Sequence, residues 1–167
     1  MSDFVNSIDV LGDDAVTDSI IDRTISSYAD DTVTIIGQNA FMYCTALTSV
    51  ALPAVTTIQS SAFSYCSALT KVDLAAVTTI KNNTFNYCSN FDTLILRNEE
   101  TVVTLENKAA FYSTKLYSGN GYIYVPRALI DSYKTASQWS NFANQFRALE
   151  DYTVDGTITG ELDPTKI

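Results

Sequence analysis

Three cysteines recur at one spacing in this chain and are the side chains best suited to chemistry. Cys44, Cys66 and Cys88 lie 22 residues apart, each at the end of a four-residue run (FMYC, FSYC and FNYC). Thiols at a fixed spacing can ligate a metal ion, supply a nucleophile, form one disulfide with one thiol left over, or pack as small buried groups. The elements that position them decide among these roles.

The segment around the cysteines is repetitive along its whole length. Aligned from an isoleucine, three copies read IGQNAFMYCTALTSVALPAVTT, IQSSAFSYCSALTKVDLAAVTT and IKNNTFNYCSNFDTLILRNEET. The alternation Val50-x-Leu52 predicts a short strand in each copy. One copy cannot bury its own apolar face, so the copies must stack as coils of a solenoid. The apolar positions that match are Ile36/Ile58/Ile80, Phe41/Phe63/Phe85, Leu47/Leu69/Phe91, Val50/Val72/Leu94 and Leu52/Leu74/Leu96.

Stacked coils place the three cysteines in a column, because equivalent residues of successive coils lie one above another. Neighbouring strands are about 4.8 Å apart, and Cβ atoms that point the same way suit a disulfide poorly. Tetrahedral metal binding needs four ligands, whereas the chain has three cysteines and no histidine. No nearby base could activate a thiolate. We therefore expect three free thiols with a structural role, and neither a metal nor a cofactor.

The repeat resembles the BspA-like (Treponema pallidum-type) leucine-rich repeat, through the pattern F-x-x-C-x-x-L-x-x-V-x-L-P-x-V-x-x-I. The likeness covers residues 32–96 and continues with altered spacing to about residue 126. The proline of the pattern is present in the first copy as Pro53, whereas the second and third copies have Ala75 and Arg97 at the equivalent positions. It implies a short, right-handed α/β solenoid with one parallel strand per coil. It also implies a non-catalytic protein, since the usual roles of that family are adhesion and protein binding at bacterial surfaces.

Both ends of such a solenoid need covers, and helical caps are expected there. Residues 14–28 show apolar side chains near helical spacing after a possible N-cap at Asp13 or Asp14, which predicts a short helix. Residues 127–149 have an apolar face that includes Trp139, which predicts one helix or two short ones as a lid on the last coil. The segment around Asp155-Gly156 predicts a small hairpin or an extended arm.

The chain reads as one folded domain with four parts. Residues 1–31 form an N-terminal arm and cap, residues 32–126 the solenoid, residues 127–151 the C-terminal cap, and residues 152–167 a tail. With 167 residues it is long enough for one domain and short for two.

The charge of the chain excludes two classes of partner. The net charge is −9, and residues 1–31 hold eight acids against Arg23 alone. Such a molecule is repelled by nucleic acid and by anionic membrane surfaces. No stretch approaches the ~18 apolar residues of a membrane span, so we expect no membrane insertion. The start, MSDFVNSIDVLGDD, has neither a basic region nor an apolar region, so we expect no signal peptide and synthesis in the cytoplasm.

Solenoids bind partners on the open face of the strand sheet. Side chains that alternate with the core positions point outward there. We expect a protein or a glycan ligand on this face, with Tyr122 and Tyr124 as the main anchors because tyrosine offers a large contact area at low entropy cost. The candidate residues are Ser49, Ala51, Lys71, Asp73, Thr93, Ile95, Tyr122 and Tyr124.

These features predict a non-enzymatic binding or structural module. The sequence has no G-x-S-x-G, no phosphate-binding glycine-rich loop and no Cys-x-x-Cys. A phage virion component (tail, fibre or head decoration) is favoured, because the chain is short and starts at Met1 without an export signal. Bacterial surface adhesion is the alternative, so the expected location is a virion or a cell surface. The arms at 1–12 and 152–167 are candidates for homo-oligomer or virion assembly.

Overall fold

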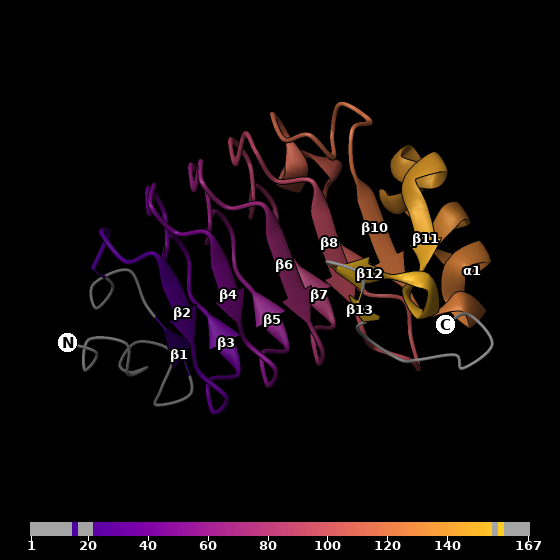
Figure 1. Cartoon of the computed structure of the whole chain (residues 1–167), viewed down its shortest axis with the longest axis horizontal. Helices are drawn as coiled ribbons and strands as arrows, with labels where there is room; N and C mark the ends of the chain where they lie inside the picture. The colour runs from indigo at the N-terminus through magenta and orange to yellow at the C-terminus, as the bar shows by residue number, and fades with distance from the viewer. Residues whose placement is uncertain (1–14, 17–21, 155–156, 159–167) are drawn as a thin grey trace.

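The computed structural model describes residues 15–16, 22–154 and 157–158, and successive coils follow one another along the long axis of the molecule (Figure 1). The larger sheet has the parallel order β11-β10-β8-β6-β4-β2, and the smaller sheet has the parallel order β1-β3-β5-β7-β9. The strands of the larger sheet are β2 (Ser27–Ala29), β4 (Ser49–Ala51), β6 (Lys71–Leu74), β8 (Thr93–Leu96), β10 (Tyr122–Val125) and β11 (Phe146–Ala148).

The predicted solenoid is confirmed by the register of the larger sheet. Val50 is the Cα partner of Val72, and Val72 is the partner of Leu94. These side chains point inward and are buried, as the alternation in the sequence requires. The same inward row is extended by Tyr28 at one end and by Ile123 at the other.

Each coil also has a second short strand, which the prediction of one strand per coil did not include. The smaller sheet consists of β1 (Ala15–Val16), β3 (Ile35–Ile36), β5 (Thr57–Ile58), β7 (Thr79–Ile80) and β9 (Thr104–Leu105). Ile36, Ile58 and Ile80 are fully buried in this sheet. Two residues are too few to show an alternation, so the sequence marks these positions as core without marking them as strands.

The interior between the sheets holds an aromatic column and the cysteine column. The rings of Phe41 and Phe63 stack with centroids 4.9 Å apart, and those of Phe63 and Phe85 with centroids 5.4 Å apart. All three cysteines are free and buried, as the stacking of the coils predicts. Because the coils share this core, no coil has a complete hydrophobic core of its own.

The predicted helix over residues 14–28 is wrong where the structure describes that segment. Residues 15–16 are strand β1 and residues 27–29 are strand β2, which pairs in parallel with β4. Tyr28 occupies the position of Val50 in the preceding coil and is buried against Phe41, with ring centroids 4.9 Å apart. The segment is therefore a further coil, and its apolar spacing only imitates a helix. Residues 14 and 17–21, and the predicted arm at 1–12, lie outside the described residues.

Arg23 satisfies backbone groups at the N-terminal end of the solenoid. Between two complete coils, the backbone amides of Phe41 and Tyr43 donate hydrogen bonds to the carbonyl oxygens of Ala62 and Ser64 in the coil that follows. At the equivalent positions Ala40 and Met42, the carbonyl oxygens accept hydrogen bonds from the Arg23 guanidinium at 3.0 Å and 2.7 Å. The Arg23 side chain thus takes the place of the two backbone amides that a preceding coil would supply, and the carbonyl oxygens of Ala40 and Met42 keep hydrogen-bond donors.

The C-terminal segment has short helices and one strand that was not predicted. Residues 146–148, expected in a helix, form β11 and extend the larger sheet beside β10. Trp139 joins this segment to the preceding coil, because its Nε1–H donates to the carbonyl oxygen of Val103 at 2.6 Å. In the described part of the segment, the short helices are η5 (Arg127–Leu129), α1 (Ile130–Thr135), η6 (Trp139–Gln145) and η7 (Leu149–Asp151). The helices labelled η are 3-10 helices, as is η4 (Lys108–Phe111) before the segment, and α1 is an α-helix.

The predicted C-terminal hairpin is present. Strand β12 (Thr153–Val154) pairs antiparallel with β13 (Thr157–Ile158), and the turn residues 155–156 lie outside the described residues. Among the residues that the structure describes, none of the helices has the length and apolar character that a membrane crossing requires.

Candidate functional site

The outward positions of the larger sheet form two rows in the predicted register. Ser49 is the partner of Lys71, Lys71 of Thr93, and Thr93 of Tyr122. The second row aligns Ala51, Asp73, Ile95 and Tyr124 in the same order. The sequence therefore placed all eight candidate residues in their correct rows.

The C-terminal segment covers one end of this face, which the sequence did not predict. Ile95 is 0% exposed because it packs in a small apolar cluster with Leu149 and Tyr152. Tyr124 is half-buried against the same segment, with its ring centroid 4.6 Å from that of Tyr152. Ile95 is thus wrong as an exposed contact residue, and Tyr124 offers only part of its surface.

Two features define the electrostatics of the covered end. Burial first, and then the neighbouring Tyr152 and Tyr122, raise the pKa of Tyr124, so its hydroxyl stays protonated at neutral pH. Tyr122 remains exposed, and the Arg147 guanidinium lies over its ring, 4.6 Å from the centroid. Through this cation–π contact Arg147 covers one face of the Tyr122 ring, and the rest of the ring stays exposed beside the covered end.

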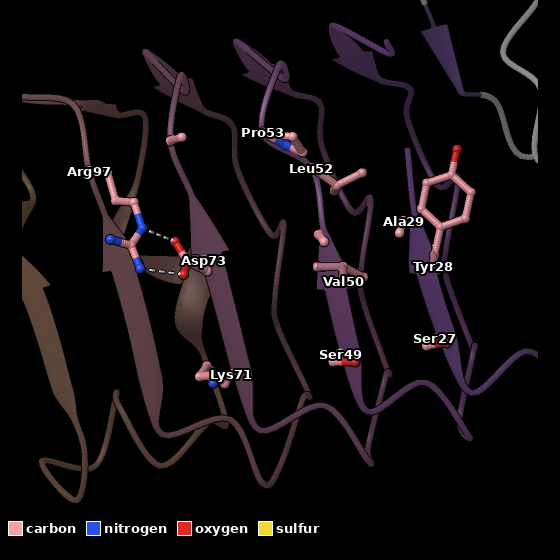
Figure 2. A pocket seen from close by; sticks show the side chains of 12 residues that line it. Ser27, Tyr28, Ala29, Ser49, Val50, Leu52, Pro53, Lys71, Asp73 and Arg97 are labelled. Carbon is pink, nitrogen blue, oxygen red and sulfur yellow. Dashed lines mark hydrogen bonds and ion pairs between the residues drawn. The ribbon is translucent and has the colours of Figure 1, made fainter. Parts of the chain in front are cut away.

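The uncovered part of the face is hollow. A cavity of about 490 Å³ opens over β2, β4 and β6 (Figure 2). Ser27, Ser49 and Lys71 lie in one row at this surface, each contributed by a different strand. Ala29 and Ala51 are small and exposed, and they leave the hollow open.

An ion pair forms one side of the hollow. The Nε and one terminal nitrogen of Arg97 each donate to a different carboxylate oxygen of Asp73 at 2.7 Å, and Figure 2 shows the two side chains facing each other. Both side chains are part-exposed, at 25% and 35%. Within the part of the chain that the structure describes, Lys71 makes no ion pair. The hollow therefore presents one free ammonium group beside a fixed, neutralised pair.

Neither a metal site nor an activated nucleophile accompanies this surface in the described residues. No group of three histidine, cysteine or acidic side chains there is arranged to hold a metal ion. The pKa of the Cys44 thiol is raised by its hydrogen bond with Cys66 and by burial, so the thiol stays protonated at neutral pH. The arrangement at the hollow can bind a partner through shape, one cation and neutral polar groups.

The family of the chain follows from a comparison of the repeats. The model of the BspA type leucine rich repeat region matches residues 21–126 with six copies, which is more than half of the chain. The chain belongs to the BspA-type leucine-rich repeat family. No curated protein matches it significantly.

The residues of this BspA-type protein that the family model matches include strand β2. The match therefore agrees with the further coil that the structure shows before residue 32. That coil contributes Ser27 and Ala29 to the hollow. The sequence analysis missed both, because it assigned Ser27 to a helix and left Ala29 in the N-terminal arm and cap. A signal was present: Ser27-Tyr28-Ala29 has the same small-large-small pattern as Ser49-Val50-Ala51.

Two further residues of the face were missed in this BspA-type chain. Arg97 aligns with the proline that follows the strand in the first copy, and nothing in the repeat indicates that its side chain turns back to Asp73. Tyr152 reaches Ile95 from beyond the last coil. A contact between segments so distant in sequence leaves no periodic signal.

Proposed function

We propose that this chain is a non-enzymatic recognition module that binds a protein through the hollow over β2, β4 and β6. The observation that carries the proposal is the hollow itself, which is open, is lined by small side chains and has charged groups on one side only. Solenoids expose their continuous sheet face for this purpose.

A protein suits the hollow better than a glycan for electrostatic reasons. Among the described residues no carboxylate pairs with Lys71, so its ammonium group favours an acidic group on the partner. Asp73 and Arg97 keep each other in place and offer further polar contacts at a fixed geometry. Ala29, Ala51 and Pro53 supply apolar contact area between these groups.

A charge reversal with a matched control tests the proposal. Lys71→Glu changes the hollow, whereas Lys81→Glu makes the same change directly after β7, on the smaller sheet. Binding to a panel of purified host extracellular proteins and bacterial surface proteins is measured by biolayer interferometry at 0.1 M salt. We expect at least one partner whose affinity falls tenfold or more in Lys71→Glu and is unchanged in Lys81→Glu. Equal effects of the two changes would remove the hollow as the binding site.

The setting that we propose for this module is a phage particle, with adhesion at a bacterial surface as the alternative. A virion component co-sediments with intact particles and has a defined, symmetric oligomer by light scattering. Co-sedimentation with a symmetric oligomer supports the particle. A monomer that does not co-sediment but binds whole bacterial or host cells through the hollow supports adhesion instead.

A further inference from the structure

A second surface, which we call the tyrosine ladder, runs along the turns that precede the strands of the larger sheet. It consists of Tyr43, Tyr65, Tyr87, Tyr112 and Tyr117. The first three rings stack with centroids 4.7 Å apart at each step and interplanar angles of 17° and 3°. Tyr87 then meets Tyr112 edge to face at 5.7 Å, and Tyr112 meets Tyr117 in the same way at 5.5 Å. The result is one continuous aromatic row.

The ladder is exposed although each ring has an aromatic neighbour. The exposed fraction is 54% for Tyr43, 46% for Tyr112, 39% for Tyr87 and 38% for Tyr117. Across the described residues, the large apolar side chains that are exposed are all tyrosines, and four of these five belong to the ladder. An aromatic patch of this kind on a soluble protein marks an interaction site more often than scattered single residues do.

The backbone of the fold does not by itself require tyrosine at these positions. Tyr43, Tyr65 and Tyr87 have φ angles of 63°, 64° and 62°, in the left-handed region. Glycine or asparagine adopts this conformation most readily, and a bulky side chain is unusual there. The equivalent position is nevertheless tyrosine in all three copies. Stacking between rings offsets part of this conformational cost and keeps the rings in a fixed row.

The middle of the ladder is poor in charged side chains. Residues 32–70 contain no charged side chain, and neither do residues 82–91. The charged groups lie at its two ends: the Arg23 guanidinium donates to the carbonyl oxygen of Met42 next to Tyr43, and Lys108 and Lys115 lie near the last two tyrosines in the sequence. No charged residue lies within four positions of Tyr65 or Tyr87 in the sequence, so a charged ligand gains little from the middle of the ladder.

The size of the ladder argues against a second copy of the chain as its occupant. A tyrosine buries roughly 150–250 Å² when fully covered, so five partly exposed rings offer about 400 Å². A stable protein–protein interface needs about 800 Å² on each partner. The row is long and narrow, and it fits an extended chain.

We infer that the tyrosine ladder binds a neutral glycan chain that lies along the solenoid axis. Sugars present hydroxyl groups and apolar C–H faces, and the ladder offers phenol hydroxyls, neutral polar side chains and aromatic rings in one row. Tyr65 has stacked neighbours on both faces, so it contributes its edge and its hydroxyl. The plane of Tyr112 is turned by 83° from that of Tyr87 and so lies along the row, where a ring can meet a sugar face.

Binding of neutral hexasaccharides to the full chain tests this inference. Cellohexaose, mannohexaose and N-acetylchitohexaose are titrated, with saturation-transfer NMR to 5 mM sugar and calorimetry for the strongest binder. We expect at least one to bind, with an affinity that changes less than twofold between 0.05 M and 0.5 M NaCl, because no ion pair is involved. Tyr112→Ser is expected to weaken binding at least tenfold.

The control and the second variant keep the test decisive. Tyr122→Ser removes a tyrosine of equal 46% exposure outside the ladder and is expected to leave sugar binding unchanged. Tyr117→Ser repeats the test if Tyr112→Ser unfolds. Failure of all three sugars to bind, equal loss in Tyr122→Ser, or binding of only an uncharged Gly-Ser-Pro peptide overturns the inference. Protein binding at the hollow is measured separately with Lys71→Glu, so failure of one site is distinguishable from failure of the other.

Discussion

The Sγ of Cys66 donates a hydrogen bond of 3.1 Å to the carbonyl oxygen of Phe41, and Cys88 repeats this bond to Phe63 at 2.9 Å. Each thiol thus joins its own coil to the coil before it. The bonds are buried, and each adds a second donor to a carbonyl oxygen that already accepts the amide of a cysteine in its own coil. This repetition gives the cysteine column its physical role.

The thiols are expected to be unreactive in the folded protein. The carbonyl acceptors and the burial leave no room for a reagent, and thiolate is the reactive form. We expect the thiol reagent DTNB to detect three free thiols after unfolding and to react more than a hundredfold more slowly with the native protein at pH 8. A count of one thiol in denaturant, or rapid native labelling, would contradict the column.

Stability is expected to fall at alkaline pH. A hydrogen bond with Cys44 lowers the pKa of the Cys66 thiol, but a bond with Cys88 and burial outweigh it, so the pKa rises overall. Unfolded thiols ionise near pH 8.5. Above that pH the unfolded chain therefore loses protons that Cys44 and Cys66 keep in the folded chain. Stability then drops by up to about 1.4 kcal/mol per pH unit for each of these two thiols.

Urea unfolding at pH 7.0, 8.5 and 9.5 measures this effect where unfolded thiols ionise far more than tyrosines, whose ordinary pKa is about 10. Cys66→Ala serves as the control, because it removes one thiol and should flatten the decline. A free energy of unfolding that stays constant to pH 9.5 would show that the thiols ionise normally in the fold.

The lid depends on one buried hydroxyl. The hydroxyl of Tyr133 accepts a hydrogen bond from the amide of Val103 at 3.0 Å, and burial raises the pKa of Tyr133 to about 12. Tyr133→Phe leaves that buried amide without a partner and should cost about 1–3 kcal/mol in urea unfolding. Tyr117→Phe removes an exposed hydroxyl and should cost less than about 0.5 kcal/mol. Equal costs would mean that the bond contributes nothing.

Gly121 lies where two segments of backbone approach closely. A Cβ atom at this position would lie 2.3 Å from the carbonyl oxygen of Asp92. Gly121→Ala must therefore displace strand β8 or β10 and is expected to cost more than about 2 kcal/mol. Gly119→Ala is the comparison: it has open space but φ +87°, and should cost only about 1 kcal/mol through the backbone. Thermal unfolding ranks the two, and the reverse order would contradict the close approach.

The ion pair beside the hollow is expected to position groups more than to stabilise the fold. A double-mutant cycle with Asp73→Ala and Arg97→Ala measures its coupling energy. Because both side chains are partly exposed, we expect only about 0.5–1 kcal/mol in 0.1 M salt, and less in 1 M salt. A coupling above about 3 kcal/mol would indicate a dry, buried pair instead.

The repeat made the core and the sheet face predictable. Positions such as Val50, Val72 and Leu94 recur at one interval, so their stacking needs no information beyond the sequence. The outward rows followed from the same register, which is why Ser49 and Lys71 were placed correctly as neighbours.

The errors arose where the interval changes or ends. Val16 pairs with Ile36 at 20 residues, while Tyr28 pairs with Val50 at 22, so the first coil is shorter than the others. It also lacks the cysteine, and its apolar spacing resembled a helix. The contact of Tyr152 with Ile95 depends on how the chain folds back after β11, which local pattern does not encode.

The central claim is that the hollow over β2, β4 and β6 holds the partner protein. A photoreactive benzophenone side chain placed at Ala51, in the hollow, tests it directly; the same group at Ala128, an exposed alanine in the C-terminal segment, is the control. After irradiation with particles or cells, we predict one discrete protein adduct from position 51 and none from position 128. Adducts of equal yield at both positions, or at position 128 alone, would contradict the claim.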